Sequence, residues 1–564
     1  MYLNEISLIK NYRNLSNCTF KFNNIVNFVI GENNIGKTNL IELLNIIFNK
    51  GKFSKQDFFD VSIPIEIIIK ISYTTEEIGF FSDFFDIEDS NSINIHIVQE
   101  SVDDRIMYFE DGNELEISFS LIKKINTYYY HSQRLPNKEL DFSKEQGNGK
   151  ILNYFVEKSL SKREYNASSF LNIDKISEVK TDINEYVSKI SSLTNDFINA
   201  YVSEEPHNFI SRLLEIGNDT VKLNDLGDGV QYAFNIILSI LDSILENKKN
   251  KTKEKFNEGL VYVGGKKYFP MLLLLDEPEI HQHPHRQKVI IKKITQILSN
   301  SDEKFIELIK ELFEIDGIIG QLFVVTHSPN ILSNDYKQFI RMFTDNNQIK
   351  VISGSNININ DNVLKHLFKL YIEIKISFFG RKVLLVEGDT EKGAFPLIAA
   401  KNGIDFEERS CTLIQMGGAD NVQPMLQIFN VFGIKAYAFL DKDKFNQYGT
   451  NNHIFYTNQK DYECEIVEIM TLNDKINSLL ILGAKNYLFG LLKKYDSFDK
   501  NQFINNNAIP ELTSSEREEF EAIITPDLIS KLQENKNQVD AYKIIESLNN
   551  YPQSILDFLS KTGD

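Results

Sequence analysis

The 564-residue chain has no tryptophan, only three cysteines and no long run of apolar residues. Cys18, Cys411 and Cys464 are scattered and form no C-x-x-C pair, which argues against a disulfide framework and against a zinc ribbon. A membrane-spanning helix needs about 18 consecutive apolar residues, and a signal peptide needs a charged and then an apolar region. The sequence offers neither. We therefore expect a cytoplasmic protein that does not contact membranes.

Positive charge is also in short supply. Lys and Arg number 61 against 79 Asp and Glu, so the formal net charge is −18. This balance argues against a surface coated in basic residues for non-specific nucleic-acid binding, but it is compatible with a local basic groove. With 42% hydrophobic and 25% charged residues, the composition is that of a globular protein with material for several cores.

Two successive groups of strand and helix patterns divide the chain, over residues 1–375 and 376–564. Within the first group, residues 136–215 are more polar and helix-like, and we interpret them as a helical insertion that could serve as a dimerisation arm. In the second group, "KVLLVEG", "CTLIQMGG" and "KAYAFLDKDK" repeat a strand-then-turn pattern with helices between them. That repeat predicts a parallel α/β sheet, followed by a largely helical C-terminal tail.

The stretch "GENNIGKT" fits the pattern G-x-x-x-x-G-K-[ST] and lies between a predicted strand, "NIVNFVIG", and a predicted helix, "KTNLIELLNIIFNK". Glycines let the backbone N–H groups approach phosphate oxygens, the lysine adds positive charge at the terminal phosphates, and the threonine hydroxyl can bind Mg²⁺. The sequence therefore predicts a nucleoside triphosphate site. Its expected residues are Gly31, Asn33, Asn34, Gly36, Lys37, Thr38 and Asn39.

Two further buried strands end in polar residues that suit the same chemistry. "MLLLLDEPE" places Asp276 to bind Mg²⁺ and Glu277 to orient or deprotonate the attacking water. "FVVTHSP" places His327 at a strand end, where it either senses the γ-phosphate or is simply a hydrogen-bonded histidine. Gly227 and Gly229 precede a long amphipathic helix, whose N-terminus is a second candidate anion site.

Two other polar stretches carry weaker signals. The charge run "ENKKNKTKEKFNEG" (246–259) predicts a solvated loop, with phosphate contact as the alternative. His281, His283 and His285 form a local cluster that could be taken for a metal site.

"GENNIGKTN", "LGDGVQ", "LLLLDEPEIHQHP" and "VVTHS" resemble, in order, the Walker A, signature, Walker B and switch-histidine motifs of ATP-binding-cassette ATPases of the RecF/SMC type. In that family the signature loop of one protomer closes over ATP bound by another, so the resemblance implies at least a dimer. The signature departs from the family pattern because no serine precedes its glycines. Histidines accompany the Walker B motif in this group, which favours a structural or phosphate-proximal role for the histidine cluster over metal binding.

Carboxylates gather after two strands of the second group. Glu387 ends one strand, and Glu391 follows four residues later, after a glycine turn. "AYAFLDKDK" ends another strand with Asp441 and Asp443, which we expect to share a face while Lys442 points away. The C-terminal ends of parallel strands line one crevice, so the four acids should converge. Divalent cations would relieve their repulsion, and oxygen ligands select Mg²⁺ or Mn²⁺. Two such ions can stabilise phosphodiester cleavage.

"VEGDTE", "QMGGAD" and "FLDKD" resemble the motifs of the Toprim domain. An ABC-type ATPase followed by Toprim is similar to the OLD family of nucleases, which includes the ATPase–nuclease subunits of Gabija-type anti-phage systems. The resemblance implies one more metal ligand, Glu463 with Glu465 as second choice. It also implies a lysine that stabilises the scissile phosphate, Lys536 with Lys543 in reserve.

The expected fold is α/β: an ABC-type P-loop ATPase domain with a helical insertion (1–375), then a Rossmann-like, parallel-sheet Toprim domain with a helical C-terminal segment (376–564). The resemblance implies an ATP-regulated, divalent-metal-dependent DNA endonuclease in anti-phage defence. The resemblance also implies that ATP binds with one Mg²⁺ or Mn²⁺ and that two such ions bind in the Toprim site. The expected metal ligands are Glu387, Glu391, Asp441, Asp443, Glu463, Thr38 and Asp276, and the expected catalytic residues are Glu387, Asp441, Asp443, Lys536 and Glu277.

Several alternatives stay open at this point. One is a non-cutting, ATP-gated DNA-binding or sensor protein of the RecF/SMC type, and another is a Toprim nuclease that acts on RNA. The expected assembly is a homo-oligomer, at least a dimer, with a tetramer and a helicase-like partner protein left open.

Overall fold

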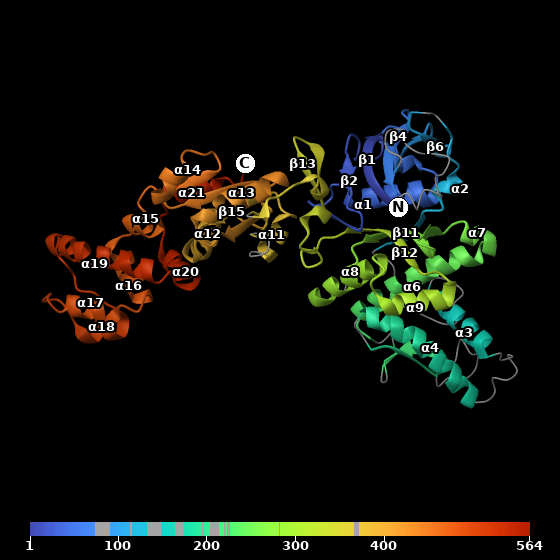
Figure 1. Cartoon of the computed structure of the whole chain (residues 1–564). Helices are drawn as coiled ribbons and strands as arrows, with labels where there is room; N and C mark the ends of the chain where they lie inside the picture. Colours follow the sequence, from blue (N-terminus) through green and yellow to red (C-terminus); the bar gives the residue numbers. More distant parts are fainter. Residues whose placement is uncertain are drawn as a thin grey trace. The chain divides into compact units, whose positions relative to one another are not determined.

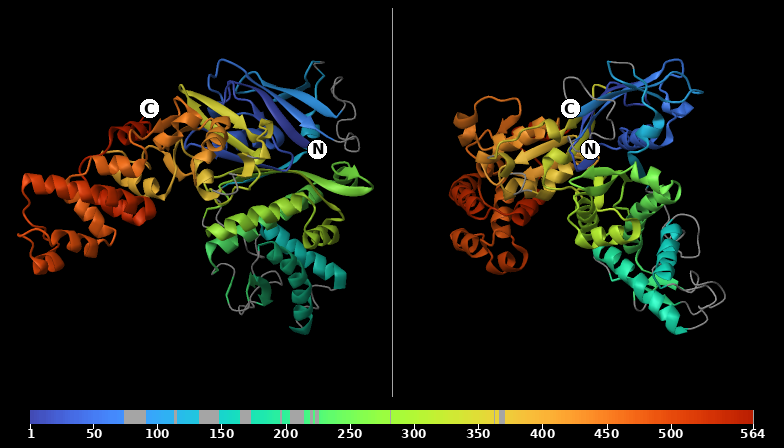
Figure 2. Two further views of the ribbon diagram at one scale, coloured as in Figure 1. Left: turned by 60° about the vertical axis from the view of Figure 1, so that its left-hand side comes forward. Right: turned by 45° about the vertical axis from the view of Figure 1, so that its right-hand side comes forward.

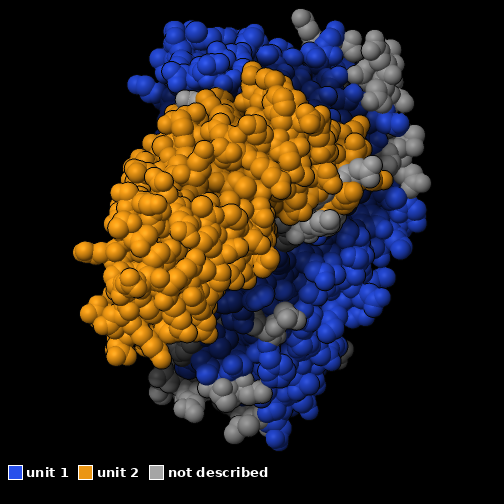
Figure 3. Space-filling model, turned by 90° about the vertical axis from the view of Figure 1, so that its left-hand side faces the viewer, with its two compact units in different colours: residues 1–357 blue, residues 358–564 orange. Residues whose placement is uncertain are grey.

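The computed structural model describes residues 1–73, 91–112, 115–131, 148–163, 173–194, 197–202, 214–218, 221–222, 226–280, 282–361, 363–365 and 371–563. The chain forms two compact units, residues 1–357 and 358–564 (Figures 1 and 3). The division into an ATPase domain and a Toprim domain at 375–376 stays a prediction from the sequence.

A five-stranded antiparallel sheet forms one layer of the first unit, with the order β2-β1-β4-β5-β6. Burial alternates residue by residue along β4, because successive side chains of a strand point to opposite faces. The strands are β1 (Tyr2–Lys10), β2 (Phe20–Lys21), β4 (Ile65–Ser72), β5 (Ser92–Gln99) and β6 (Met107–Glu110).

A seven-stranded, mainly parallel sheet forms the second layer. Its order is β10-β11-β12-β3-β13-β14, and β7 also pairs with β11. β7, β11, β12, β3 and β13 run parallel, while β10 and β14 are antiparallel edges. Strand β3 is buried along its whole length, as expected where both faces are covered. The strands are β3 (Val26–Gly31), β7 (Asn126–Tyr130), β10 (Val261–Val263), β11 (Lys266–Asp276), β12 (Gly317–Val325), β13 (Phe339–Asp345) and β14 (Gln348–Ser353).

Helix α1 lies in the core between the two sheets, where Leu44 belongs to the same apolar cluster as Ile6 of β1 and Leu274 of β11. Helices α6, α8 and α9 lie on the other side of the seven-stranded sheet (Figures 1 and 2). The helices outside the insertion are α1 (Lys37–Asn45), which continues as the π-helix η1 (Ile46–Lys50), η2 (Lys55–Asp57), α2 (Phe119–Ile122), α6 (Asp228–Lys249), α7 (Lys253–Asn257), α8 (Pro284–Leu298), α9 (Glu303–Phe313), η7 (Tyr336–Gln338) and η8 (Gly354–Asn356).

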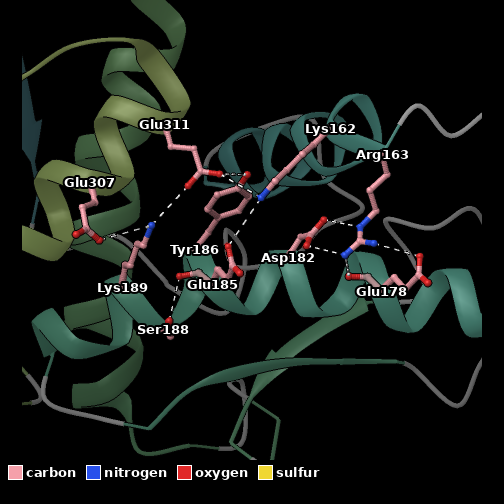
Figure 4. Close-up of polar contacts among 10 residues, drawn as sticks. All are labelled: Lys162, Arg163, Glu178, Asp182, Glu185, Tyr186, Ser188, Lys189, Glu307 and Glu311. Atoms are coloured by element: carbon pink, nitrogen blue, oxygen red, sulfur yellow. Dashed lines mark hydrogen bonds and ion pairs between the residues drawn. The ribbon is translucent and has the colours of Figure 1, made fainter.

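The described part of the insertion consists of helices α3 (Gly149–Arg163) and α4 (Ile173–Thr194) and of the short hairpin β8 (Asn199–Val202) and β9 (Leu214–Gly217). Arg163 joins α3 to α4 through Asp182 at 2.6 Å. Tyr186 and Lys189 of α4 reach Glu311 of α9 at 3.0 and 3.5 Å (Figure 4). The helical character agrees with the sequence analysis, although residues 136–147, 164–172, 195–196 and 203–213 lie outside the described residues. The role as a dimerisation arm stays a prediction.

The second unit contains a four-stranded sheet with the order β16-β15-β17-β18, and every pair in it is parallel. The predicted parallel sheet is therefore confirmed. The strands are β15 (Lys382–Val386), β16 (Cys411–Gln415), β17 (Lys435–Leu440) and β18 (Ile454–Tyr456).

Helices make up most of the rest of this unit, and the predicted helical C-terminal segment is confirmed. Their apolar faces share one core with the sheet, in which Phe395, Phe439 and Phe558 pack together. The helices are α11 (Tyr371–Ser377), α12 (Asp389–Lys401), η9 (Ala419–Asn421), α13 (Val422–Val431), η10 (Lys442–Lys444), α14 (Phe445–Tyr448), α15 (Tyr462–Glu468), α16 (Leu472–Ile481), α17 (Lys485–Leu492), α18 (Lys500–Asn506), α19 (Ser514–Glu534), α20 (Gln538–Ser547) and α21 (Gln553–Ser560).

The loop predicted over residues 246–259 is wrong. Helix α6 extends to Lys249, and α7 follows within the same charge run. The Thr252 side chain caps α7 by accepting a hydrogen bond from the Lys255 N–H, and Phe256 is buried. The N-cap and the buried Phe256 stabilise the short helix α7 in a segment whose charges suggest a loop. No helix in the described ranges is both long and apolar enough to cross a membrane.

Candidate functional site

The phosphate-binding loop follows strand β3 and leads into helix α1. Gly31 has a φ of 129°, and a Cβ there would lie 1.8 Å from the carbonyl oxygen of Met342. Gly36 has a φ of 92°, and a Cβ there would lie 2.5 Å from Oδ1 of Asn14. Residues with side chains rarely adopt such φ values, and these would also clash. The path of the loop therefore depends on both glycines.

Lys37 stands at the start of α1 with its amine turned back into the loop. Its Nζ donates to the carbonyl oxygens of Gly31 at 3.0 Å and Glu32 at 2.5 Å. Burial lowers the pKa of Lys37 to about 8, against the opposing effect of nearby carboxylates such as Glu277. A bound triphosphate would give this buried amine charged oxygen partners in place of neutral carbonyls.

Asp276 is the last residue of strand β11, and its Oδ1 accepts a hydrogen bond from the Thr38 hydroxyl at 3.3 Å. Burial raises the pKa of Asp276 to about 6, and the charge of Glu277 adds to the effect. A hydroxyl and a buried carboxylate in contact form an oxygen pair of the kind that Mg²⁺ prefers.

Glu277 and His327 come from adjacent strand ends and face each other, with His327 Nε2 3.3 Å from Glu277 Oε1. Glu279 supports this arrangement by accepting hydrogen bonds from the Thr326 hydroxyl and from the His327 N–H, both at 2.7 Å. Burial lowers the pKa of His327, which favours the neutral ring. The geometry is compatible with both interpretations of His327, as a phosphate sensor and as a hydrogen-bonded residue at a strand end.

An open cleft of about 600 Å³ lies over this loop. Most of the predicted nucleotide-binding residues line it, namely Asn33, Asn34, Gly36, Lys37, Thr38, Asn39, Glu277 and His327. Gly227 and Gly229 do not line this cleft; they belong to the start of helix α6, of which Gly227 is the N-cap. Their closure over a nucleotide in another protomer stays a prediction.

Two residues of this region were missed in the sequence analysis. Asn14 lines the cleft, accepts a hydrogen bond from Asn39 at 2.7 Å and donates to the carbonyl of Ile35 at 3.2 Å. His131 follows β7, which pairs with the last residues of β11, and its charge acts on Asp276. A signal for His131 was present in the sequence, because the strand pattern "TYYYHS" ends in polar residues, as do the patterns "MLLLLDEPE" and "FVVTHSP".

The histidine cluster of the Walker B segment has a structural role in the described residues. The His283 ring caps helix α8 by accepting a hydrogen bond from the His285 N–H at 3.4 Å, and the two rings stack. His281 lies outside the described residues.

The second candidate site lies at the C-terminal edge of the sheet in the other unit. Strands β15 and β17 are neighbours, and Glu387 and Asp441 are the first residues after them. The glycine turn after β16 holds this edge, because the Gly418 N–H donates to the Glu387 carbonyl at 3.1 Å. Burial, and then the charge of Glu387, raises the pKa of Asp441 to about 7.

Glu391 is buried in the first turn of α12 and points back to the strand end. Its Oε2 accepts a hydrogen bond from the Gly388 N–H at 3.2 Å. Burial raises the pKa of Glu391 to about 8, and the negative charges of Asp441, Glu463 and Glu387 add to the effect. These contributions show that the acids lie within electrostatic reach of one another.

The prediction that Asp441 and Asp443 share the face of one strand is wrong. Strand β17 ends at Leu440, and Asp443 lies in the short helix η10. The chain leaves the sheet because the Lys442 N–H donates to the Thr457 hydroxyl at 2.8 Å. The Asp443 side chain is 51% exposed and lies 3.3 Å from the Lys444 amine. Its charge still raises the pKa of Glu387, after burial.

The structure distinguishes between the alternative residues, Glu463 or Glu465 as the further metal ligand and Lys536 or Lys543 as the lysine. Glu463 is buried in the first turn of α15, and its Oε1 lies 3.1 Å from the Lys536 amine. Glu465 is instead held by the Asn458 N–H at 2.6 Å and by the Ser554 hydroxyl. Lys543 is exposed on α20, and its side chain has no hydrogen bond or ion pair with a described residue. The geometry thus brings Glu463 and Lys536 to the acids.

The short segment that carries Lys536 is fixed on both sides. Before it, Gln533 of α19 donates to Asp461 at 2.7 Å. After it, Gln538 of α20 donates to Asp389 at 2.8 Å, and the backbone of Gln538 packs so closely on α12 that a Cβ at Gly393 would lie 2.4 Å from its carbonyl oxygen. Tight helix packing therefore determines which lysine reaches the acids.

The chemistry of this acid site fits a divalent cation. Oε2 of Glu387 and Oε2 of Glu463 are both buried without a hydrogen-bond partner among the described residues. Buried carboxylate oxygens normally have a partner, and a cation would supply one while neutralising their repulsion. In the described ranges, no three His, Cys, Asp or Glu side chains are grouped closely enough to hold a metal ion as they stand. Cation binding therefore requires these side chains to move closer together.

Taken together, these features define a chain that joins a P-loop ATPase domain to a Toprim domain. The family model described as "AAA domain", which its description links to the AbiEii toxin of type IV toxin–antitoxin systems, matches residues 26–333, more than half of the chain. The chain belongs to this family. A second family model, "Overcoming lysogenization defect protein-like, TOPRIM domain", matches residues 378–443.

Curated relatives of the chain carry nuclease names. "Endonuclease GajA" of Bacillus cereus (strain HuB5-5) is 23% identical over 62% of this chain and 52% of that protein, and "Old nuclease" of Escherichia phage P2 is 24% identical over 52% and 46%. "Endonuclease GajA" of Bacillus cereus (strain VD045) is 24% identical over 73% and 70%. The chain thus spans about half the length of the first two relatives.

Solved structures with weak overall similarity include an SMC head bound to the C-terminal winged-helix domain of ScpA, with 16% identity, a TM-score of 0.38 and coverage of 65% of this chain and all of that one. The C-terminal region of the Burkholderia pseudomallei OLD protein gives 13% identity, a TM-score of 0.22 and coverage of 33% and 98%.

Proposed function

We propose that the protein is an ATP-regulated, divalent-metal-dependent DNA endonuclease of the OLD type. The observation that carries the proposal is the group of buried and half-buried acids at the edge of the second sheet, where Glu387 and Glu463 each keep a buried oxygen without a partner in the described residues. Buried carboxylates that repel one another serve a metal site better than they serve folding.

In this proposal the metal ligands are Glu387, Glu391, Asp441, Asp443 and Glu463. Two Mg²⁺ or Mn²⁺ ions bound there would supply the Lewis-acid stabilisation that phosphodiester cleavage requires. Lys536 neutralises Glu463 at 3.1 Å in the structure, and when cations take over that role it turns its charge to the scissile phosphate.

The first unit supplies the ATP switch. Lys37 and the loop glycines hold the triphosphate, Thr38 and Asp276 hold its Mg²⁺, and Glu277 orients the attacking water. ATP binding joins two or more protomers through the Gly227 and Gly229 segment, so the active assembly is a dimer or a tetramer. We place the enzyme in anti-phage defence, acting on DNA either alone or with a helicase-like partner, on the basis of the relatives' names and the resemblance to OLD nucleases.

The test is a cleavage assay of purified protein on supercoiled plasmid, with Mg²⁺ or Mn²⁺ and with or without ATP. We expect nicked and linear products from the native protein and at least a hundredfold loss of rate in Asp441→Ala. The matched control is Glu468→Gln, which alters an exposed acid of α15 that lies outside the acid cluster. Cleavage that continues unchanged in Asp441→Ala would overturn the proposal. A parallel RNA substrate decides between DNA and RNA.

One observation favours the second candidate, a non-cutting, ATP-gated DNA-binding protein. In the part of the chain that the structure describes, no three candidate ligands are already grouped as a metal site. In that case Mn²⁺ would not bind to the second unit, and the protein would bind plasmid in an ATP-dependent manner without cutting it. Calorimetric titration with Mn²⁺ in the absence of nucleotide separates the two functions.

A further inference from the structure

A second large pocket opens on the first unit, at the other end of the P-loop helix. Its volume is about 760 Å³, within the range of small-molecule sites, and none of its lining residues lines the ATP cleft. It lies between the C-terminal end of α1 with η1, the edge strand β7 and helix α6. The ATP cleft lies at the N-terminal end of α1, so the two sites share that helix.

The charge of the pocket favours an anion. The lining holds three lysines, Lys123, Lys150 and Lys251, and two acids, Asp242 and Glu246. Lys150 pairs with Glu246 at 2.5 Å and also faces the charge of Asp242, which leaves Lys123 and Lys251 as lysines that form no ion pair with a described residue. Burial lowers the pKa of Lys251, and the positive charges of Lys124 and Lys123 lower it further. Lys123 and Lys251 therefore repel one another. A phosphate between them would relieve this repulsion and give both amines a strong partner.

The walls of the pocket favour a base attached to that phosphate. Phe48, Tyr128 and Tyr129 supply aromatic surface. The lining also carries the carboxamides of Asn45, Asn49, Asn247 and Asn250, which keep donors or acceptors for the edge of a base beyond the bonds from Asn49 to Asn45 and from Asn247 to Asn126. The carboxamides of Asn126 and Asn148 bond within the protein. Aromatic faces with mixed donors and acceptors beside lysines are the usual elements of nucleotide recognition.

We propose that this pocket is a second nucleotide site, which takes a base with at least one phosphate and regulates the ATP site. Two of its walls lead directly to that site. Helix α1 begins with Lys37, and strand β7 runs beside β11, which carries Asp276 at its end. A π-helical segment such as η1, which contributes Phe48 and Asn49 to the pocket, is frequently found at functional sites.

The experiment uses the full chain with Lys37→Ala, which removes the lysine of the ATP cleft. Calorimetric titration with ATP, AMP, GTP and inorganic triphosphate should show saturable binding of a nucleotide to one remaining site per chain. Adding Lys123→Glu and Lys251→Glu should weaken that binding at least tenfold, whereas Lys55→Glu, an exposed lysine outside the pocket, should leave it unchanged. Unchanged melting temperatures show that the variants fold.

Three results would overturn the proposal: no saturable binding in Lys37→Ala, binding that survives the double charge reversal, and displacement of the bound nucleotide by a short DNA duplex, which would identify a DNA surface instead. The outcome is independent of the proposed endonuclease activity, because neither nuclease substrate nor metal-dependent cleavage enters the measurement.

Discussion

Glu391 is a buried acid of the Toprim edge, and without a cation its negative charge is destabilised by burial and by the neighbouring acids. Replacement by Gln keeps an oxygen for the Gly388 N–H and removes one of several repelling charges. In EDTA at pH 8.5 we therefore expect Glu391→Gln to raise the melting temperature by a few degrees. Mn²⁺ should stabilise the native protein and have less effect on the variant.

Differential scanning fluorimetry measures both effects, with Glu468→Gln as the control on an exposed acid. Two results together would contradict the assignment of Glu391 to a cation site. These are a melting temperature of Glu391→Gln below that of the native protein in EDTA, and stabilisation of Glu391→Gln by Mn²⁺ as large as that of the native protein.

Single residues also show where sequence reasoning stops. Gly31, Gly36 and Lys37 could be predicted because the loop pattern is local and its chemistry demands those residue types. Asp443 was misplaced because the strand ends early, through a contact between the Lys442 N–H and Thr457, fifteen residues downstream. Nothing in the spacing D-x-D reports that contact.

At the scale of elements, the packing of α12 on α20 positions Lys536. Gly393→Ala would place a Cβ 2.4 Å from the Gln538 carbonyl oxygen, so the helices must separate. We expect a loss of roughly 1–3 kcal/mol in the free energy of unfolding, as in other overpacked cores. Plasmid cleavage should fall at least tenfold, while ATP binding stays as in the native protein.

The matched control is Gly490→Ala in helix α17, where an added Cβ meets nothing within 4 Å. That variant should keep its activity and gain slightly in stability, because alanine has the higher helix propensity. Equal cleavage by Gly393→Ala and Gly490→Ala would show that Lys536 does not depend on this packing.

Elements were predicted well where their pattern is strong, and poorly where tertiary contacts decide. The buried strands β3, β11 and β15 are apolar runs in the sequence, and each is followed by residues with polar or charged side chains of the candidate sites. The sequence analysis names Lys536 first, with Lys543 in reserve, but it could not predict the packing of α12 on α20 that brings Lys536 to the acids. It could not predict the second pocket either, which needs the edge strand β7 beside α6. Contacts between segments so far apart leave no signature in one sequence.

At the scale of the whole molecule, the proposal requires protomers to meet around ATP. Glu277→Gln removes the residue proposed to activate water and should keep ATP bound, so we expect it to shift the protein towards the dimer when ATP and Mg²⁺ are added. Light scattering after size-exclusion chromatography measures the mass. Lys37→Ala is the control that should show no shift, and an identical response of both variants would count against nucleotide-driven assembly.

The most direct test of the central claim is a crystal structure of the protein grown with Mn²⁺, with anomalous diffraction recorded at the manganese edge. The account predicts Mn²⁺ at the edge of the four-stranded sheet, bound by Glu387, Asp441 and Glu463, with the Lys536 amine moved away from Glu463. Anomalous density that is absent from this edge, with the Lys536–Glu463 ion pair intact, would contradict it.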